Sequence, residues 1–261
     1  MKILAYYIFS SYICKRYSLL LKMKYVLLPE TIQNGRPKRL SFYLAMEEYV
    51  ARYVAEDECF FMWQVEPSVI FGRNQLVENE VNLDYCRRHD IQVYRRKSGG
   101  GCVYADKDNV MLSYVSQGDS VGLAFNQFIQ MVLLVLRRMG VEAVGTQHND
   151  VLICDRKVCG TACYHVDGRN IVHGTLLYDT NMDHMLQAIT PSQEKLQSKG
   201  IQSVRQRITL LKDYVALTLE EVKALICQTL CDGVVVLTDG QVREIEQLEQ
   251  AYLQKDFINK L

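Results

Sequence analysis

Apolar positions along the chain follow two different periods. Residues 40–54 carry apolar side chains three to four positions apart, which predicts an amphipathic helix. A second stripe with the same spacing runs from residue 125 to residue 139 and stops at Gly140, so it predicts a long buried helix ending at a glycine. Residues 81–89 predict a shorter and more polar helix.

Short β-rich runs separate these helical stripes. They cover residues 23–28, 60–65, 68–71, 91–94, 110–116, 149–154, 157–163 and 170–178. The polar pairs Asp155-Arg156 and Asp167-Gly168 stand between the last three runs and predict tight hairpins.

Two helix-start signals close the chain. The run Thr218-Leu-Glu-Glu221 has the spacing of a capping box, and Thr238-Asp-Gly-Gln241 opens a last helix that reaches Tyr252. Helices and hairpins mix without regular β-α-β alternation. The sequence therefore predicts an α+β fold with a mixed, largely antiparallel sheet flanked by helices.

Composition narrows the class of protein. The chain has 261 residues, which suits one large domain, and its formal net charge is zero. No global field is therefore expected to draw it to nucleic acid or to an anionic membrane, and we expect neither partner. Nine cysteines at irregular spacings are typical of reduced thiols, and this favours a cytoplasmic location.

The first 22 residues differ from the rest. An apolar run from residue 3 to residue 14 is too short to cross a bilayer, which needs about 20 residues. We expect residues 1–22 to be a non-essential extension, because Met23 begins a self-sufficient strand.

The stretch RRKSGGG, residues 95–101, is the first with evident chemical potential. Three glycines in a row form either a flexible loop or a surface of bare N–H groups for a phosphate. Arg96 has the forked guanidinium that suits a carboxylate or phosphate. The glycines lie between two predicted strands, and the phosphate-loop pattern is absent, so neither common nucleotide fingerprint applies.

Three other positions carry groups suited to catalysis. Asn149 and Asp150 begin a strand, Lys157 lies within the next strand, and His173 lies in the middle of another. Taken singly, a strand lysine is more often a surface residue and a strand histidine more often a core residue. The cysteines at 154, 159 and 163 lack the paired spacing of a zinc framework.

The order of these segments is more specific than any one of them. RRKSGGG, HNDVLI, DRKVCGTA, HGTLL and KLQSKGIQSVRQRITLL, with GRNQ at 72–75, together resemble the lipoate–protein ligase A and lipoyltransferase family. The resemblance runs from about residue 23 to about residue 211. It implies a catalytic domain like that of biotin ligases and class II synthetases.

The resemblance also implies roles for individual residues. Lys157 would be the essential lysine, contacting the acyl carbonyl and the α-phosphate, and Asp150 would lie at the nucleotide end as a tentative Mg²⁺ ligand. The implied binding residues for lipoate and its adenylate are Arg73, Asn74, Arg96, Ser98, Gly99, Gly100, Gly101, Asn149, Asp150, Gly160 and His173.

The implied reaction uses ATP, Mg²⁺ and lipoate, forms lipoyl-AMP, and transfers the acyl group to a lysine of a lipoyl domain. The implied acceptors are the E2 subunits of 2-oxoacid dehydrogenases and the glycine-cleavage H protein. Phosphoryl oxygens gain charge during activation, which suits cationic side chains, backbone N–H groups and a metal ion.

Two departures leave alternatives open. Ala105 stands where the family pattern has a histidine, and only about fifty residues follow Leu211. We expect residues 23–232 to form the catalytic domain and residues 233–261 a helical tail without a full accessory domain, so that a separate accessory subunit is possible. The alternatives are a lipoyltransferase that uses a pre-activated or protein-bound lipoyl group, a cysteine-dependent octanoyltransferase, and a non-catalytic lipoate-binding or lipoyl-domain-binding protein.

Overall fold

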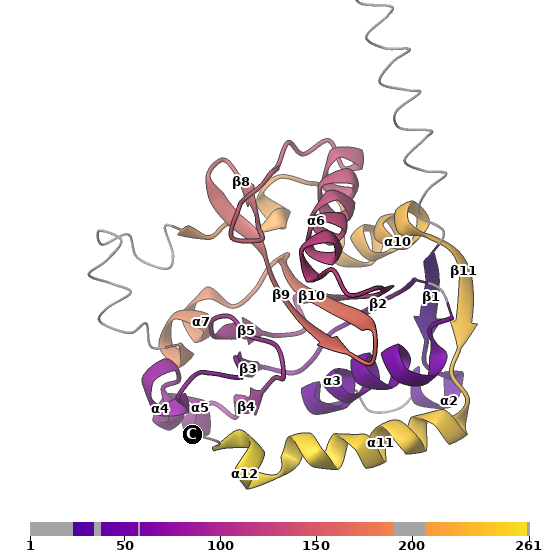
Figure 1. The fold of residues 1–261 in the computed structure, drawn as a ribbon. Helices are drawn as coiled ribbons and strands as arrows, with labels where there is room; N and C mark the ends of the chain where they lie inside the picture. Colours follow the sequence, from indigo (N-terminus) through magenta and orange to yellow (C-terminus); the bar gives the residue numbers. More distant parts are fainter. Residues whose placement is uncertain (1–22, 34–37, 57, 190–206, 260–261) are drawn as a thin grey trace, which may run out of the picture.

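The structure is a computed structural model that describes residues 23–33, 38–56, 58–189 and 207–259. A mixed sheet of eight strands forms its centre (Figure 1). In spatial order the strands are β11 (Cys231–Val236), β1 (Met23–Leu27), β2 (Cys59–Trp63), β6 (Asn109–Gln117), β10 (Arg169–Leu177), β9 (Arg156–Val166), β8 (Asp150–Ile153) and β7 (Val144–Gly145). The first three are parallel to one another and the remaining pairs are antiparallel, as the predicted fold class requires.

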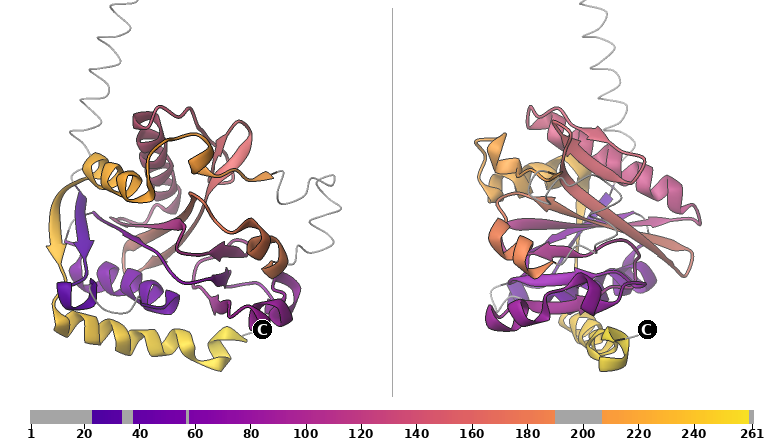
Figure 2. Two further views of the ribbon diagram at one scale, coloured as in Figure 1. Left: turned by 180° about the vertical axis from the view of Figure 1, so that it is seen from behind. Right: turned by 90° about the vertical axis from the view of Figure 1, so that its left-hand side faces the viewer.

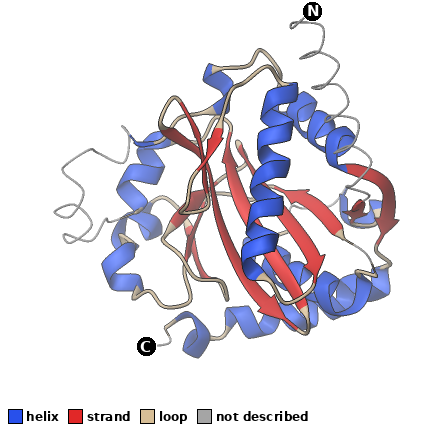
Figure 3. Ribbon diagram, turned by 45° about the horizontal axis from the view of Figure 1, so that its top comes forward, coloured by secondary structure: helices blue, strands red, loops and turns tan. Residues whose placement is uncertain are grey.

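Helices cover both faces of this sheet (Figure 3). On one face lie α6 (Val121–Arg138) and α10 (Leu219–Leu230), and on the other lie α3 (Leu40–Tyr49), its π-helical continuation Val50–Val54, and α11 (Asp239–Leu253). Successive residues of one strand enter different cores: Phe60 packs with α6 and α10, whereas Phe61 packs with α3 and α11. This two-sided burial explains why the strands are continuous apolar runs.

Helix α6 is long and apolar enough to cross a membrane by length and composition alone. Its buried residues, which include Phe128, Val132 and Leu136, pack against the sheet, and the core helix of a globular protein passes the same test.

A smaller sheet lies beside the α3 face. It has the order β4 (Gln92–Arg95), β3 (Ser68–Phe71), β5 (Val103–Ala105), with β4 parallel and β5 antiparallel to β3. The short helices α4 (Val77–Glu80), α5 (Leu83–Arg88) and α7 (Met182–Ala188) pack around it. Residues 96–102 connect β4 to β5, so the three glycines lie between two strands, as predicted.

The predicted elements are mostly present, with some shifts. Both capping boxes form, at Thr218 and at Thr238. The hairpin at Asp167-Gly168 is confirmed, and both residues have positive φ. The other hairpin turns at Cys154-Asp155 and not at Asp155-Arg156, because Arg156 pairs with Ile153 and the two turn residues adopt positive φ.

The C-terminal segment belongs to the same body as the rest. The expected boundary at residue 232 falls inside β11, which pairs in parallel with β1. The sequence analysis did not predict this strand. After β11, α11 runs along α3 and ends near α12 (Lys255–Ile258) (Figure 2). The expected extension at residues 1–22 lies outside the described residues, and α2 (Glu30–Gln33) is the first helix described.

Candidate active site

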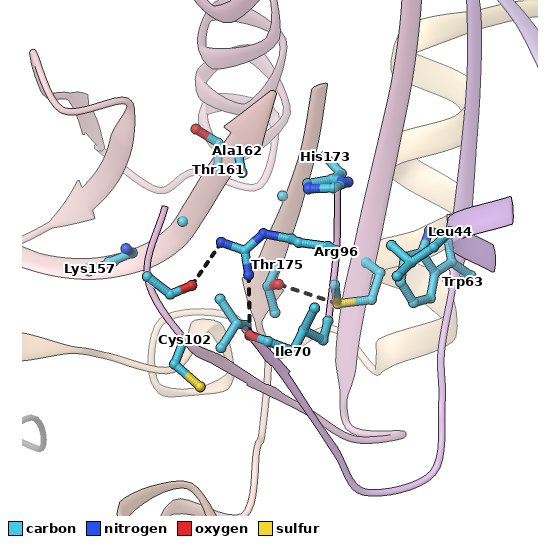
Figure 4. A pocket seen from close by; sticks show the side chains of 15 residues that line it. Leu44, Trp63, Ile70, Arg96, Cys102, Lys157, Thr161, Ala162, His173 and Thr175 are labelled. Atoms are coloured by element: carbon cyan, nitrogen blue, oxygen red, sulfur yellow. Dashed lines mark hydrogen bonds between the residues drawn. The ribbon is translucent and has the colours of Figure 1, made fainter. Parts of the chain in front are cut away.

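A cavity of about 100 Å³ lies where the small sheet meets the α3 face of the main sheet. Figure 4 shows side chains converging on it from α3, β2, β3, β9 and β10. Its lining residues are Leu44, Trp63, Ile70, Arg96, Gly101, Cys102, Val103, Met111, Lys157, Gly160, Thr161, Ala162, His173, Gly174 and Thr175. One part is therefore apolar, whereas Lys157 and His173 bring polar nitrogen atoms to other parts of the wall.

Lys157 is held by an ion pair at this wall. Its Nζ lies 2.8 Å from Oδ1 of Asp150 on the neighbouring strand, and its side chain is 38% exposed. A Cβ atom built on Gly160 would lie 2.5 Å from Cε and 2.6 Å from Nζ of Lys157. Glycine at position 160 therefore leaves the space that the ammonium group occupies.

Residues 96–102, here named the glycine loop, are held in place by close backbone contact with the turn after β3. A Cβ atom on Gly72 would lie 2.2 Å from the carbonyl oxygen of Gly100, so the turn after β3 approaches the loop too closely for any side chain. Gly100 itself has a φ of +90°, a conformation that other residues rarely adopt. The N–H of Arg73 donates to the Ser98 carbonyl at 2.9 Å, which ties the two segments further.

Arg96 organises this loop. Its guanidinium donates to the carbonyl oxygens of Ile70, Gly99 and Gly101 and to Oγ of Ser98, at 2.7 to 3.1 Å. Burial lowers the pKa of Arg96 to about 10. Four of the five N–H donors of a guanidinium are used in this way, so the fork that the sequence suggested for a carboxylate or phosphate is largely occupied by the protein itself.

A buried hydrogen-bond chain links the loop to helix α3. Oγ of Ser98 lies 2.7 Å from Nε2 of His173, and Nδ1 of His173 lies 2.9 Å from Oε2 of Glu47. Oγ of Ser113 donates to the other Glu47 oxygen at 2.6 Å, and the indole N–H of Trp63 donates to Ser113 at 2.8 Å. The chain fixes the imidazole ring of His173 where it lines the cavity.

The remaining predicted residues are placed around this centre. Arg73 and Asn74 are exposed in the turn after β3 and do not line the cavity. Asn149 has a φ of 61° and accepts a hydrogen bond at its carbonyl from the Thr161 hydroxyl. The structure therefore brings Lys157, Asp150, Gly160, Arg96, Gly101 and His173 together, while the acyl-pocket role of Arg73 and Asn74 stays a prediction.

Three thiols near the cavity are poor nucleophiles. Burial raises the pKa of Cys102, Cys159 and Cys163 to about 12 in each case. A thiol with such a pKa is almost entirely protonated at neutral pH.

A metal ion would have few protein ligands here. Among the described residues, no group of three or more histidine, cysteine, aspartate or glutamate side chains is arranged to hold one. Asp150 is a single carboxylate, and Mg²⁺ in nucleotide sites is commonly held by one or two carboxylates together with substrate phosphates. Asp150 fits that limited role.

The sequence analysis did not predict several residues of the site. Glu47, Ser113 and Trp63 lie on elements that it predicted, but no local motif marks them. Outside the cavity lining, Asp106 accepts hydrogen bonds from the Asn181 N–H, the Thr180 hydroxyl and the Asp108 N–H. It therefore shapes a turn next to Ala105, which is fully buried.

Comparison with known proteins agrees with this arrangement. The family described as "Lipoyl protein ligase A/B catalytic domain" matches residues 40–231, which include every residue of the cavity. The chain belongs to this lipoyl ligase family. The predicted resemblance is confirmed, and the chain is an enzyme of this class.

Individual relatives give the extent of the match. The chain is 36% identical to lipoate–protein ligase 1 of Staphylococcus aureus, over 83% of this chain and 69% of the relative. It is 35% identical to lipoate-protein ligase LplJ of Bacillus subtilis, over 74% of this chain and 59% of that relative. The matches thus span about 60 to 70% of the lengths of these two relatives.

A solved structure shows the same fold over nearly its whole length. It is described as a bi-partite lipoate protein ligase with its E2 lipoyl domain from Thermoplasma acidophilum. The TM-score is 0.78 at 25% identity, and the match covers 92% of this chain and 98% of that one.

Proposed function

We propose that this protein attaches lipoate to a specific lysine of lipoyl domains, through a lipoyl-AMP intermediate formed from ATP. The observation that carries the proposal is the ion-paired Lys157 at the wall of a partly apolar cavity, in a chain of the lipoyl ligase family. The apolar lining, which includes Leu44, Ile70 and Met111, suits an acyl chain, and the Lys157 side suits its carboxylate and a phosphate.

In the first step the lipoate carboxylate attacks the α-phosphorus of ATP, a mixed anhydride forms, and pyrophosphate leaves. The ammonium of Lys157 stabilises the charge on the phosphoryl oxygens, and its ion pair with Asp150 fixes its direction. Mg²⁺, when bound, supplies further neutralisation of phosphate charge, and Asp150 is the residue that would hold it.

In the second step the amine of the acceptor lysine attacks the acyl carbonyl. The carbonyl oxygen becomes anionic, AMP leaves, and the amine proton goes to solvent or to the departing phosphate. Lys157 again stabilises the developing charge. His173, fixed by Ser98 and Glu47, shapes the cavity that holds the acyl group in position.

We infer that the acceptors are lipoyl domains of E2 subunits and the H protein. The Thermoplasma relative is described together with its E2 lipoyl domain, which supports the first of these. That relative is also described as bi-partite, so a requirement for a second polypeptide during activation is part of the proposal. We place the reaction in the cytoplasm, in keeping with a cysteine content typical of reduced thiols.

One experiment separates this proposal from its alternatives. The protein is incubated with an apo lipoyl domain and one of three donors: lipoate with Mg-ATP, synthetic lipoyl-AMP, or lipoylated H protein. Transfer from lipoate with ATP supports the complete ligase reaction. Transfer from lipoyl-AMP alone indicates the second half-reaction and a missing partner, and transfer from H protein alone indicates an amidotransferase.

If the protein only binds lipoate, it should bind lipoate but transfer no acyl group from any donor. That result would overturn the proposal. The cysteine-dependent octanoyltransferase reaction is disfavoured by the raised pKa values of the three thiols near the cavity. Octanoyl transfer that disappears on alkylation of one of these thiols would instead support the cysteine-dependent reaction.

A further inference from the structure

Three consecutive cations precede the glycines, and each of them binds a different part of the protein. Arg96 stays within the loop and its neighbouring strand. Arg95 and Lys97 instead reach the segment from residue 239 to residue 258, which comprises α11 and α12 and is here named the C-terminal arm. This segment lies about 150 positions away along the chain.

Arg95 joins the arm to the turn that contacts the glycine loop. Its side chain is almost fully buried, and its Nε donates to the carbonyl of Ile258 in α12 at 3.0 Å. Its Nη1 donates to the carbonyl of Arg73 at 2.7 Å, and the guanidinium lies 4.6 Å from the ring centroid of Phe71. One side chain therefore bridges α12 and the turn whose Gly72 touches Gly100.

Lys97 makes a second connection to the arm. Its Nζ pairs with the buried carboxylate of Glu48 on α3 and lies 4.8 Å from the ring centroid of Tyr252 on α11. The Tyr252 hydroxyl donates to the same carboxylate at 3.1 Å. The loop, α3 and α11 therefore meet at one buried charge, directly before Ser98.

The arm has its own anchor, away from the cavity. Phe257 of α12 packs edge-on against Tyr252, with ring centroids 5.5 Å apart, and is partly buried against the core that contains α3. Phe257 does not line the cavity. Loosening α12 at Phe257 releases the partner of Arg95 without touching the residues that face a substrate.

We propose that Arg95 and Lys97 are positioning residues through which the C-terminal arm holds the glycine loop in its substrate-binding shape. The loop in turn holds His173 through Ser98, so a displaced arm alters the cavity. The inference rests on the proposed function for its substrate. It goes further by making the affinity of the cavity depend on a segment that contributes no residue to it.

The test uses full-length variants. Phe257→Ala and Lys97→Met should raise the KM for lipoate about tenfold while kcat changes less than about twofold, because they disturb binding geometry and not the reacting groups. Lys97→Arg keeps the cation and should recover most of the affinity. Lys255→Ala is the matched control on α12, since Lys255 is exposed.

Hydrogen exchange supplies a readout that does not depend on activity. The amides of Gly99 to Gly101 should exchange faster in Phe257→Ala and Lys97→Met than in Lys255→Ala. If Phe257→Ala does not fold, Lys97→Met and Tyr252→Phe, which removes only the hydroxyl, decide the question. Loop exchange that matches the wild type in the folded variants overturns the inference, even if no transfer is seen.

The kinetic outcomes are distinguishable in the same series. Transfer by the wild type with an unchanged KM in the variants overturns only the role of the arm. Absence of wild-type transfer from all three donors overturns the proposed function.

Discussion

Replacing Gly160 by alanine should lower activity about a hundredfold to a thousandfold while sparing the fold. The added Cβ would lie 2.5 Å from Cε and 2.6 Å from Nζ of Lys157, well inside contact distance. Both atoms belong to the far end of a flexible side chain, so the lysine can swing away and the backbone can stay. We therefore expect a loss of stability below about 1 kcal/mol, as for substitutions that create no cavity and bury no charge.

The catalytic cost follows from what the lysine loses. Once displaced, Nζ no longer lies 2.8 Å from Oδ1 of Asp150, and it leaves the position from which we propose that it stabilises the phosphoryl and acyl oxygens. Removal of one preorganised stabilising group costs about a hundredfold to a thousandfold in kcat, which is roughly 2.7 to 4 kcal/mol. Gly160→Ala should lose activity in this range, and Lys157→Ala should abolish transfer with the fold intact.

The assay is transfer to an apo lipoyl domain, measured separately from lipoate with Mg-ATP and from lipoyl-AMP, with thermal unfolding as the check on folding. Gly122→Ala is the matched control, because a Cβ there meets no atom within 4 Å apart from its chain neighbours and its own helix backbone. The double variant Gly160→Ala/Lys157→Ala should be no worse than Lys157→Ala, since both changes act through one ammonium group. A folded Gly160→Ala protein with near-normal turnover would refute the reasoning.

Three other predictions concern stability and the thiols. Gly72→Ala should destabilise the protein by about 2 kcal/mol or more in urea unfolding, because its Cβ meets the rigid carbonyl of Gly100 at 2.2 Å; an unchanged midpoint would contradict this close approach. Cys159→Ala should keep transfer within about twofold, since burial raises the pKa of this thiol to about 12, and loss of acyl transfer in a folded variant would point to a cysteine mechanism. Burial would raise the pKa of Glu48, but hydrogen bonds from Lys97, Arg52 and Tyr252 lower it below its ordinary value of 4.5. Its carboxylate therefore stabilises the fold above about pH 4.5 and loses that effect as the pH falls through the lower folded value, so Glu48→Gln should flatten the dependence of unfolding free energy on pH in this acidic range.

Local patterns accounted for most helices and strands because their signals are local. The capping boxes at Thr218 and Thr238 and the paired turn at Asp167-Gly168 depend on residues within a few positions of one another. Strand β11 was not predicted, because its sequence, CDGVVV, is short and directly follows a helix. Its partner β1 lies about 200 residues earlier in the chain.

The sequence by itself determined the fold class and the family, and it singled out the segments to which we assign the chemistry, with Lys157 and the glycine loop among them. Only the tertiary structure decided what the three cations before the glycines bind. Arg96 donates hydrogen bonds to carbonyl oxygens of its own loop, whereas Arg95 and Lys97 contact Ile258 and Tyr252, which lie far along the chain. The identity of a charged residue does not show whether its side chain binds a substrate or a buried carbonyl group of the protein. Its role depends on which distant groups the fold brings within hydrogen-bonding distance.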